Sequence, residues 1–149
     1  MDLPLKKYFK IDKRTLGTIS SIDLLKRKKD IIIPYSQRMS DSNKINEILQ
    51  YQKEFNKKNE GKFNFLGVIN FHFCLENNKY YLVDGQHRYN AISKLVAENE
   101  DFDIVLEIIE IQTPCQLLEN YNLINKNTPL PELSDNINKL THKLVFQYF

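Results

Sequence analysis

Alternation of hydrophobic and polar residues predicts a β-hairpin in the middle of the chain. In segment 69–75 every second residue is large and apolar, whereas Asn70, His72 and Cys74 fall on the other face. A period of two residues is typical of a strand that is buried on one side only. Four turn-forming residues follow, and the apolar run 80–83 returns as the partner strand. We therefore expect a half-buried hairpin here.

Apolar residues at helical spacing flank this hairpin on both sides. Before it, apolar positions three or four residues apart predict an amphipathic helix from about Asp41 to Asn59, closed by Gly61. After it, the spacing in segment 91–96 predicts a helix that begins where the hairpin ends. The polar segment 84–88 is therefore expected at a strand-to-helix junction.

Shorter patterns complete the prediction. We expect strands at 16–20, 31–33 and 104–111, and helices capped by Ser21, Thr113 and Ser134, the second with a proline at N1 and a capping-box Gln116 at N3. Strands that alternate with helices favour a mixed α/β (α+β) fold, a compact domain with a small mixed sheet flanked by helices. All of 1–149 is expected to be one domain, with a core of about 16–132 and a C-terminal helix of about 134–148.

Composition narrows the class of protein without deciding its function. The 149 residues are 42% hydrophobic and 27% charged, values that are ordinary for globular proteins. The formal net charge of +2 provides no strong field for nucleic acid, and the most basic run, 26–29, is a weak clue. Cys74 and Cys115 form no disulfide or zinc pattern, and no apolar run reaches the length of a membrane span. A cytoplasmic protein without a membrane partner is expected.

The chemistry of segment 84–88, Asp-Gly-Gln-His-Arg, indicates an anion site. The first N–H groups of a helix have no partners inside the helix and carry partial positive charge, which attracts phosphate. Gly85 lets an anion approach the backbone, Gln86 adds an uncharged donor, and His87 and Arg88 add further donors. Phosphate binding at this junction is therefore the leading hypothesis.

Asp84 leaves two interpretations open. A carboxylate repels phosphate unless a metal ion bridges them or the carboxylate binds a hydroxyl group instead. Asp84 is thus a candidate ligand of Mg²⁺ or of a sugar. Alternatively, Asp84 only caps the helix, Gly85 forms the turn, and His87 and Arg88 are ordinary surface residues.

This segment resembles a known family. The run 83–91 is similar to the Asp-Gly-Gln-His-Arg signature of a branch of the ParB/sulfiredoxin superfamily, where it also follows a hairpin. Five specified residues arise by chance in such a chain on the order of once in 10⁴ to 10⁵. Segment 33–38, with Gln37 and Arg38, and segment 123–127, with Asn125 and Asn127, resemble two further elements of the family. The resemblance spans roughly 16–132.

The resemblance implies a nucleotide-binding domain. Gly85, His87 and Arg88 would bind phosphates, helped by Gln86, Gln37, Arg38, Asn125 and Asn127. The implied cofactor is a nucleoside triphosphate, ATP or CTP, with Mg²⁺ at Asp84. The implied setting is a DNA-associated process such as partitioning, DNA modification or viral or phage genome handling, with DNA or a DNA-binding protein as partner.

The chain also departs from the family pattern. Sulfiredoxins carry a cysteine where Gln86 stands, so repair of cysteine sulfinic acid is not expected. In the nucleotide switch of ParB proteins, a Glu precedes the Asn and an Arg follows, but here Ile124 and Thr128 occupy those places. CTP-driven clamping and hydrolysis are therefore not implied, and no room remains after Glu132 for a helix-turn-helix.

Two alternatives remain beside nucleotide binding. One is a metal-dependent phosphotransferase, NTPase or nuclease in which Asp84, His87 and Arg88 are catalytic, Asp84 as metal ligand or general base. The other is a protein-interaction module that keeps the motif only as a helix start, and the aromatic C-terminus 145–149 would suit a homodimer. A catalytic pair of His72 and Cys74 lacks an orienting group, so we expect His72 to face solvent or to be hydrogen-bonded.

Overall fold

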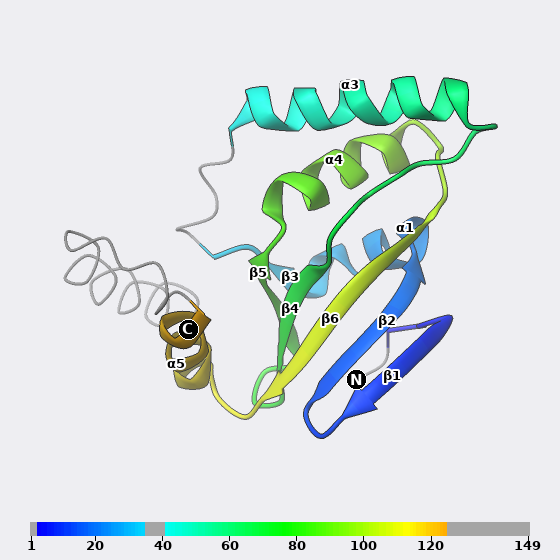
Figure 1. Cartoon of the computed structure of the whole chain (residues 1–149). Coiled ribbons are helices and arrows are strands. Elements are labelled where there is room, and N and C mark those ends of the chain that lie inside the picture. The colour runs from blue at the N-terminus through cyan, green and yellow to red at the C-terminus, as the bar shows by residue number, and fades with distance from the viewer. Residues whose placement is uncertain (1–2, 35–40, 125–149) are drawn as a thin grey trace.

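The computed structural model describes residues 3–34 and 41–124, which build one six-stranded sheet with helices around it (Figure 1). The strands are β1 (Lys7–Ile11), β2 (Arg14–Ser20), β3 (Ile31–Ile32), β4 (Ile69–Cys74), β5 (Lys79–Asp84) and β6 (Asp103–Ile111). The helices are α1 (Ser21–Leu25), α3 (Ser42–Lys58), α4 (Gln86–Ala97) and α5 (Pro114–Ile124), with a 3₁₀ turn at Lys28–Asp30. This arrangement confirms the expected mixed α/β class.

The sheet mixes parallel and antiparallel pairs in the order β1-β2-β6-β4-β5-β3. Hairpins join β1 to β2 and β4 to β5, while β6 pairs parallel with β4 and antiparallel with β2. The short β3 adds a parallel edge to β5. The predicted hairpin is confirmed, and Asn78 takes the positive φ of 57° that its turn requires.

Helices cover both faces of this sheet. On one face, α1 and α4 close the larger core, and α3 lies along the outer side of α4 (Figure 1). Fully buried members of this core include Phe71, Leu82 and Ile92. On the other face, Leu117 of α5 joins a smaller cluster with Cys74, Tyr81, Val83 and Ile111.

The expectation of a half-buried strand at β4 is wrong because of this second cluster. Phe71, His72 and Cys74 are all 0% exposed, although they lie on opposite faces of β4. Strand β4 lies between β5 and β6 in the interior of the sheet, and α5 helps to cover the face that the pattern assigned to solvent. His72, a polar residue on the face that the alternation assigns to solvent, is enclosed by the protein.

His72 is buried, and neither ring nitrogen has a hydrogen-bond partner among residues 3–34 and 41–124. The expectation that it would face solvent or be hydrogen-bonded is therefore wrong. His72 forms no hydrogen bond with Cys74, whose thiol instead lies 3.7 Å from the Gln112 carbonyl oxygen. Burial lowers the pKa of His72 from its ordinary 6.5 to about 4, and the Glu107 carboxylate offsets only part of that shift. His72 is therefore a neutral, buried imidazole with a cost in stability.

Two local features differ from the sequence prediction. Strand β1 was not predicted, because its five residues are all exposed and its sequence, Lys-Tyr-Phe-Lys-Ile, has no regular alternation of apolar and polar side chains. Ser21 is the first residue of α1 and not its cap, and Ser20, at the N-cap, makes no side-chain capping bond. Both hydroxyls instead donate to the Asp101 carboxylate, at 2.6 and 3.4 Å, which lowers the pKa of Asp101.

The three longer predicted helices are confirmed. Asp41 caps α3 by accepting a bond from Asn43 N at 2.9 Å, and Gly61 N closes the helix on the Asn56 carbonyl. At α5, the Gln116 side chain accepts from Gln112 N at 2.6 Å, one residue before the capping-box position. The helix expected at about 134–148 and the aromatic segment 145–149 lie outside the described residues. In the described part of the chain, every helix is too short or too polar to cross a bilayer.

The buried histidine predicts a specific pH dependence of stability. The unfolded chain binds a proton at residue 72 below its ordinary pKa of 6.5, whereas the folded chain does so only below about 4. Stability is therefore complete above this window and is lost as the pH falls through it, by about 2 kcal/mol at pH 5. His72→Leu should be more stable than the wild type at pH 5, with a smaller difference at pH 7.5.

Urea denaturation of the two proteins at pH 5 and pH 7.5 measures this difference. Comparison with the variant removes the contribution of every other titrating group, which both proteins share. An equal loss of stability between the two pH values in both proteins would contradict a neutral, buried His72.

Candidate functional site

The strand-to-helix junction predicted from the sequence opens onto a pocket of about 800 Å³. Three parts of the chain line it: one face of α3, the segment before β4, and the end of β5 with the first turn of α4. The lining residues that carry polar or aromatic groups are Glu47, Tyr51, Gln52, Asn64, Phe65, Asp84, Gln86, His87 and Arg88. A volume of this size is within the range of small-molecule and cofactor sites.

Gly85 forms the junction between β5 and α4. It is the N-cap of α4 in the left-handed conformation, with φ at 96°, and as a glycine it has no side chain with which to cap the helix. The interpretation of Asp84 as the cap is therefore wrong, because Asp84 precedes the N-cap residue and its 76% exposed carboxylate lies 3.9 Å from Arg88 Nη2. A Cβ at residue 85 would also lie 3.2 Å from Ile69 Cγ1. Glycine therefore suits this position both because of its positive φ and because of the close approach of Ile69.

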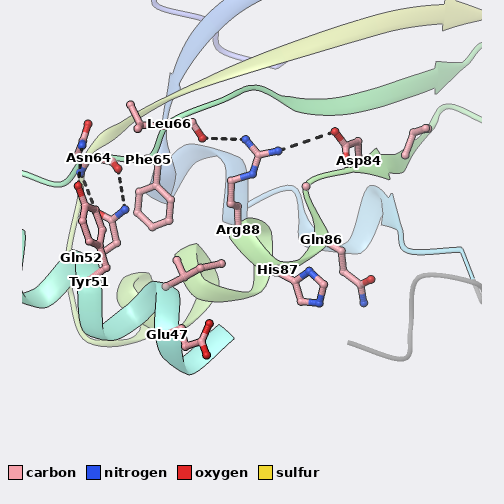
Figure 2. Close-up of a pocket in the computed structure, with 13 residues that line it drawn as sticks. Glu47, Tyr51, Gln52, Asn64, Phe65, Leu66, Asp84, Gln86, His87 and Arg88 are labelled. Atoms are coloured by element: carbon pink, nitrogen blue, oxygen red, sulfur yellow. Dashed lines mark hydrogen bonds and ion pairs between the residues drawn. The ribbon is translucent and has the colours of Figure 1, made fainter. Parts of the chain in front are cut away.

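Arg88 lies in the middle of the pocket, where its guanidinium group faces the Leu66 carbonyl and the Asp84 carboxylate (Figure 2). Its Nη1 donates to the Leu66 carbonyl at 2.9 Å, and its Nη2 lies 3.9 Å from Asp84 Oδ2. A Cβ at Gly67 would collide with Nη1, and one at Gly85 would lie 3.4 Å from Nη2. Two glycines with positive φ therefore make room for the guanidinium group.

His87 connects the starts of two helices. Its Nε2 accepts a hydrogen bond from Asp41 N at 3.2 Å, so the proton of the neutral ring is on Nδ1. Asp41 is the N-cap of α3, and His87 belongs to the first turn of α4. Both helices therefore begin at the same end of the pocket, with His87 Nδ1 left as a donor.

Gln52 and Asn64 shape the opposite end of the pocket, and sequence reasoning missed both. The Gln52 amide donates to the Asn64 carbonyl at 2.8 Å and accepts from Asn64 N at 2.7 Å. Gln52 is only 3% exposed, and these two hydrogen bonds hold the segment before β4 against α3. The signal was present in the sequence, because Gln52 follows Ile48 by four residues and so interrupts the apolar stripe of the helix.

The structure thus brings together five of the predicted site residues. Asp84, Gly85, Gln86, His87 and Arg88 all line the pocket, and Gln86 is 9% exposed. The remaining four candidates, Gln37, Arg38, Asn125 and Asn127, lie outside the described residues. Their contribution to the pocket therefore stays a prediction from the sequence.

The charges around the pocket are nearly balanced. Glu47 and Asp84 are acidic and Arg88 is basic, while His87 Nε2 accepts a bond from Asp41 N. Among residues 3–34 and 41–124, no group of three acidic, histidine or cysteine side chains could hold a metal ion. Mg²⁺ at Asp84 would therefore need most of its ligands from phosphate and water, which is its usual mode of binding beside nucleotides.

Comparison with models of protein families, with curated proteins and with solved structures found no match for this chain. The geometry of the pocket therefore has to carry the functional argument.

The contact between Gly67 and Arg88 can be tested by substitution. Gly67→Ala should lose about 1.5 kcal/mol more stability than Gly61→Ala, because the new Cβ displaces Arg88 from the Leu66 carbonyl. The two glycines have similar φ values, 83° and 79°, but residue 61 has no atom within 4 Å of a new Cβ. Chemical denaturation of both variants measures the difference.

The excess loss should disappear in the double variant with Arg88→Ala, which removes the colliding group. Equal losses in Gly67→Ala and Gly61→Ala would show that Arg88 does not occupy this place.

Proposed function

We propose that this domain binds the phosphates of a nucleotide at the start of α4. The observation that carries the proposal is Gly85, a left-handed N-cap with no side chain to cover the helix start, on the wall of a pocket large enough for a nucleotide. The free N–H groups of the first turn and the partial positive charge of the helix favour an anion there. His87 Nδ1 and the remaining donors of Arg88 lie on the same turn.

Binding rather than turnover is the proposal, because the N–H groups of α4, His87 and Arg88 suit a bound phosphate and the Asp84 carboxylate is assigned to Mg²⁺. The nucleotide would be ATP or CTP with Mg²⁺, as the resemblance to the ParB/sulfiredoxin superfamily implies. That resemblance also motivates a role in a DNA-associated process in the cytoplasm, with DNA or a DNA-binding protein as partner.

One observation favours a second function, that of a protein-interaction module without a ligand. The hydrogen bond from Arg88 to the Leu66 carbonyl uses one arm of the guanidinium for the fold. This structural role would explain the presence of Arg88 in segment 84–88 even if the domain bound no nucleotide. Ligand binding separates the two functions.

Nucleotide binding should raise the thermal stability of the wild-type protein. ATP, CTP, GTP, ADP and inorganic phosphate are compared with and without Mg²⁺ by thermal unfolding. A ligand at 100 times its dissociation constant stabilises by about 2.7 kcal/mol, a shift of about 5–10 °C for a domain of this size. Arg88→Ala should lose most of this shift.

Arg14→Ala provides the matched control, because Arg14 is a 66% exposed arginine on β2 that pairs with Glu107 outside the pocket. It should keep the full shift. No shift with any ligand would refute nucleotide binding and favour the interaction module.

The role of Asp84 can be separated from that of Arg88. If Asp84 binds Mg²⁺, Asp84→Asn should weaken binding in Mg²⁺ by about tenfold and remove the effect of the metal. If Asp84 only repels phosphate, the same substitution should strengthen binding without Mg²⁺. Isothermal titration with and without Mg²⁺ distinguishes these results, and we expect the first.

A further inference from the structure

The pocket has two ends of different chemistry, and the proposed phosphate site occupies only one of them. Asp84, Gln86 and His87 lie at the end where α4 begins, whereas Tyr51, Gln52 and Asn64 lie together at the other, with Phe65 and Arg88 between (Figure 2). The pocket is further lined by the apolar side chains Ile48 and Leu66. An inorganic phosphate would leave this apolar end unfilled.

Tyr51 is held in place at this far end. One side of its ring stacks on Phe55, with the ring centres 6.2 Å apart and the planes 29° apart. Its hydroxyl oxygen accepts a hydrogen bond from Asn64 Nδ2 at 3.2 Å. Although Phe55 and Asn64 restrain it, Tyr51 remains 50% exposed and lines the pocket. Its ring is therefore a pre-oriented aromatic surface open to a ligand.

The polar groups beside Tyr51 already have partners. Both ends of the Gln52 amide bond the backbone of Asn64, and the Asn64 side chain bonds Tyr51. Phe65 stacks on Phe102 with a centre distance of 5.3 Å. The described side chains at this end therefore present ring faces and aliphatic groups, while their hydrogen-bonding capacity is largely used within the protein.

A planar, heteroaromatic group fits this chemistry. Aromatic side chains stack on the face of any nucleobase, and such stacking is tolerant of base identity because every base has a π face. Hydrogen-bond readout of the base edge would require free donors and acceptors, and the Gln52 amide and Asn64 Nδ2 are already bonded within the protein.

We propose that Tyr51 is the stacking platform for the base of the bound nucleotide, with Leu66 and Phe65 enclosing it. This inference rests on the proposed phosphate site at the other end of the same pocket. It assigns the ligand as a nucleoside phosphate and not an inorganic polyphosphate, and it makes base recognition dependent on stacking and weakly selective among bases.

The test compares ligands with and without a base. Isothermal titration in Mg²⁺ measures the affinities of ATP, CTP and inorganic tripolyphosphate for the wild type. We expect both nucleotides to bind at least tenfold more tightly than tripolyphosphate and to differ from one another by less than about fivefold. Equal affinities for nucleotides and tripolyphosphate would overturn the assignment of a base, while leaving the phosphate site intact.

Variants at residue 51 locate the platform. Tyr51→Ala should weaken nucleotide binding by about five- to a hundredfold, the range found for base–aromatic stacking, with little effect on tripolyphosphate. Tyr51→Phe keeps the ring and should restore most of the nucleotide affinity. Tyr51→Leu keeps an apolar side chain against Phe55 but has no ring, so it should bind nucleotides as weakly as Tyr51→Ala. This variant controls for a loss of packing in Tyr51→Ala that could disturb the fold.

Tyr8→Ala is the matched control, because Tyr8 is a 69% exposed tyrosine on β1 away from this pocket. It should bind all three ligands as the wild type does. Parallel losses for nucleotides and tripolyphosphate in Tyr51→Leu would show that residue 51 supports the fold rather than the base. Absence of binding by all three ligands would refute the phosphate site and the base platform together.

Discussion

The hydrogen bond between Arg88 Nη1 and the Leu66 carbonyl connects the two walls of the pocket. Arg88 belongs to the first turns of α4, and Leu66 belongs to the segment that leads into β4. The bond requires Gly67, because a Cβ there would collide with Nη1, and Gly85 likewise keeps the neighbouring backbone close to Nη2 without a side chain. The shape of the pocket therefore depends on a contact between one cation and two backbone positions without side chains.

Two further contacts extend this arrangement along the pocket. His87 accepts from the N–H of the α3 cap, and Gln52 on α3 fastens the segment before β4. Each contact joins elements that are distant in sequence, and each uses a side chain that would otherwise be available to a ligand. The pocket is thus held open by polar side chains, while its unfilled surfaces are helix N–H groups at one end and aromatic faces at the other.

Segment 84–88 can therefore support both the fold and ligand binding, because different groups of the segment serve each role. Gly85 has no side chain that could cap the helix, and none of the side chains in 3–34 and 41–124 is bonded to the first N–H groups of α4. Arg88 is 24% exposed and partly committed to Leu66, so it acts on a ligand with its remaining donors only. Phosphate recognition in this site would combine the backbone N–H groups of α4 with the donors of Arg88 that the Leu66 carbonyl leaves unused.

Local patterns in the sequence determined the elements that form the site. The alternation along β4, the helical spacing of α3 and α4 and the glycine at the junction are properties of neighbouring residues, and they placed segment 84–88 at the start of a helix. Sequence reasoning failed where exposure depends on distant parts of the chain. His72 looked like the polar face of a half-buried strand, and β1 lacked a clear hydrophobic pattern because both its faces are exposed.

Only the tertiary structure decided which residues meet. The pocket joins α3, the segment before β4 and the start of α4, and the partnership of Gln52 with Asn64 or of Arg88 with Leu66 has no signature in local spacing. Burial inside the sheet likewise turned His72 into a neutral side chain, although its position in the strand pattern suggested the polar face. Local spacing sets the backbone conformation, whereas burial and contact arise from long-range packing that no short segment encodes.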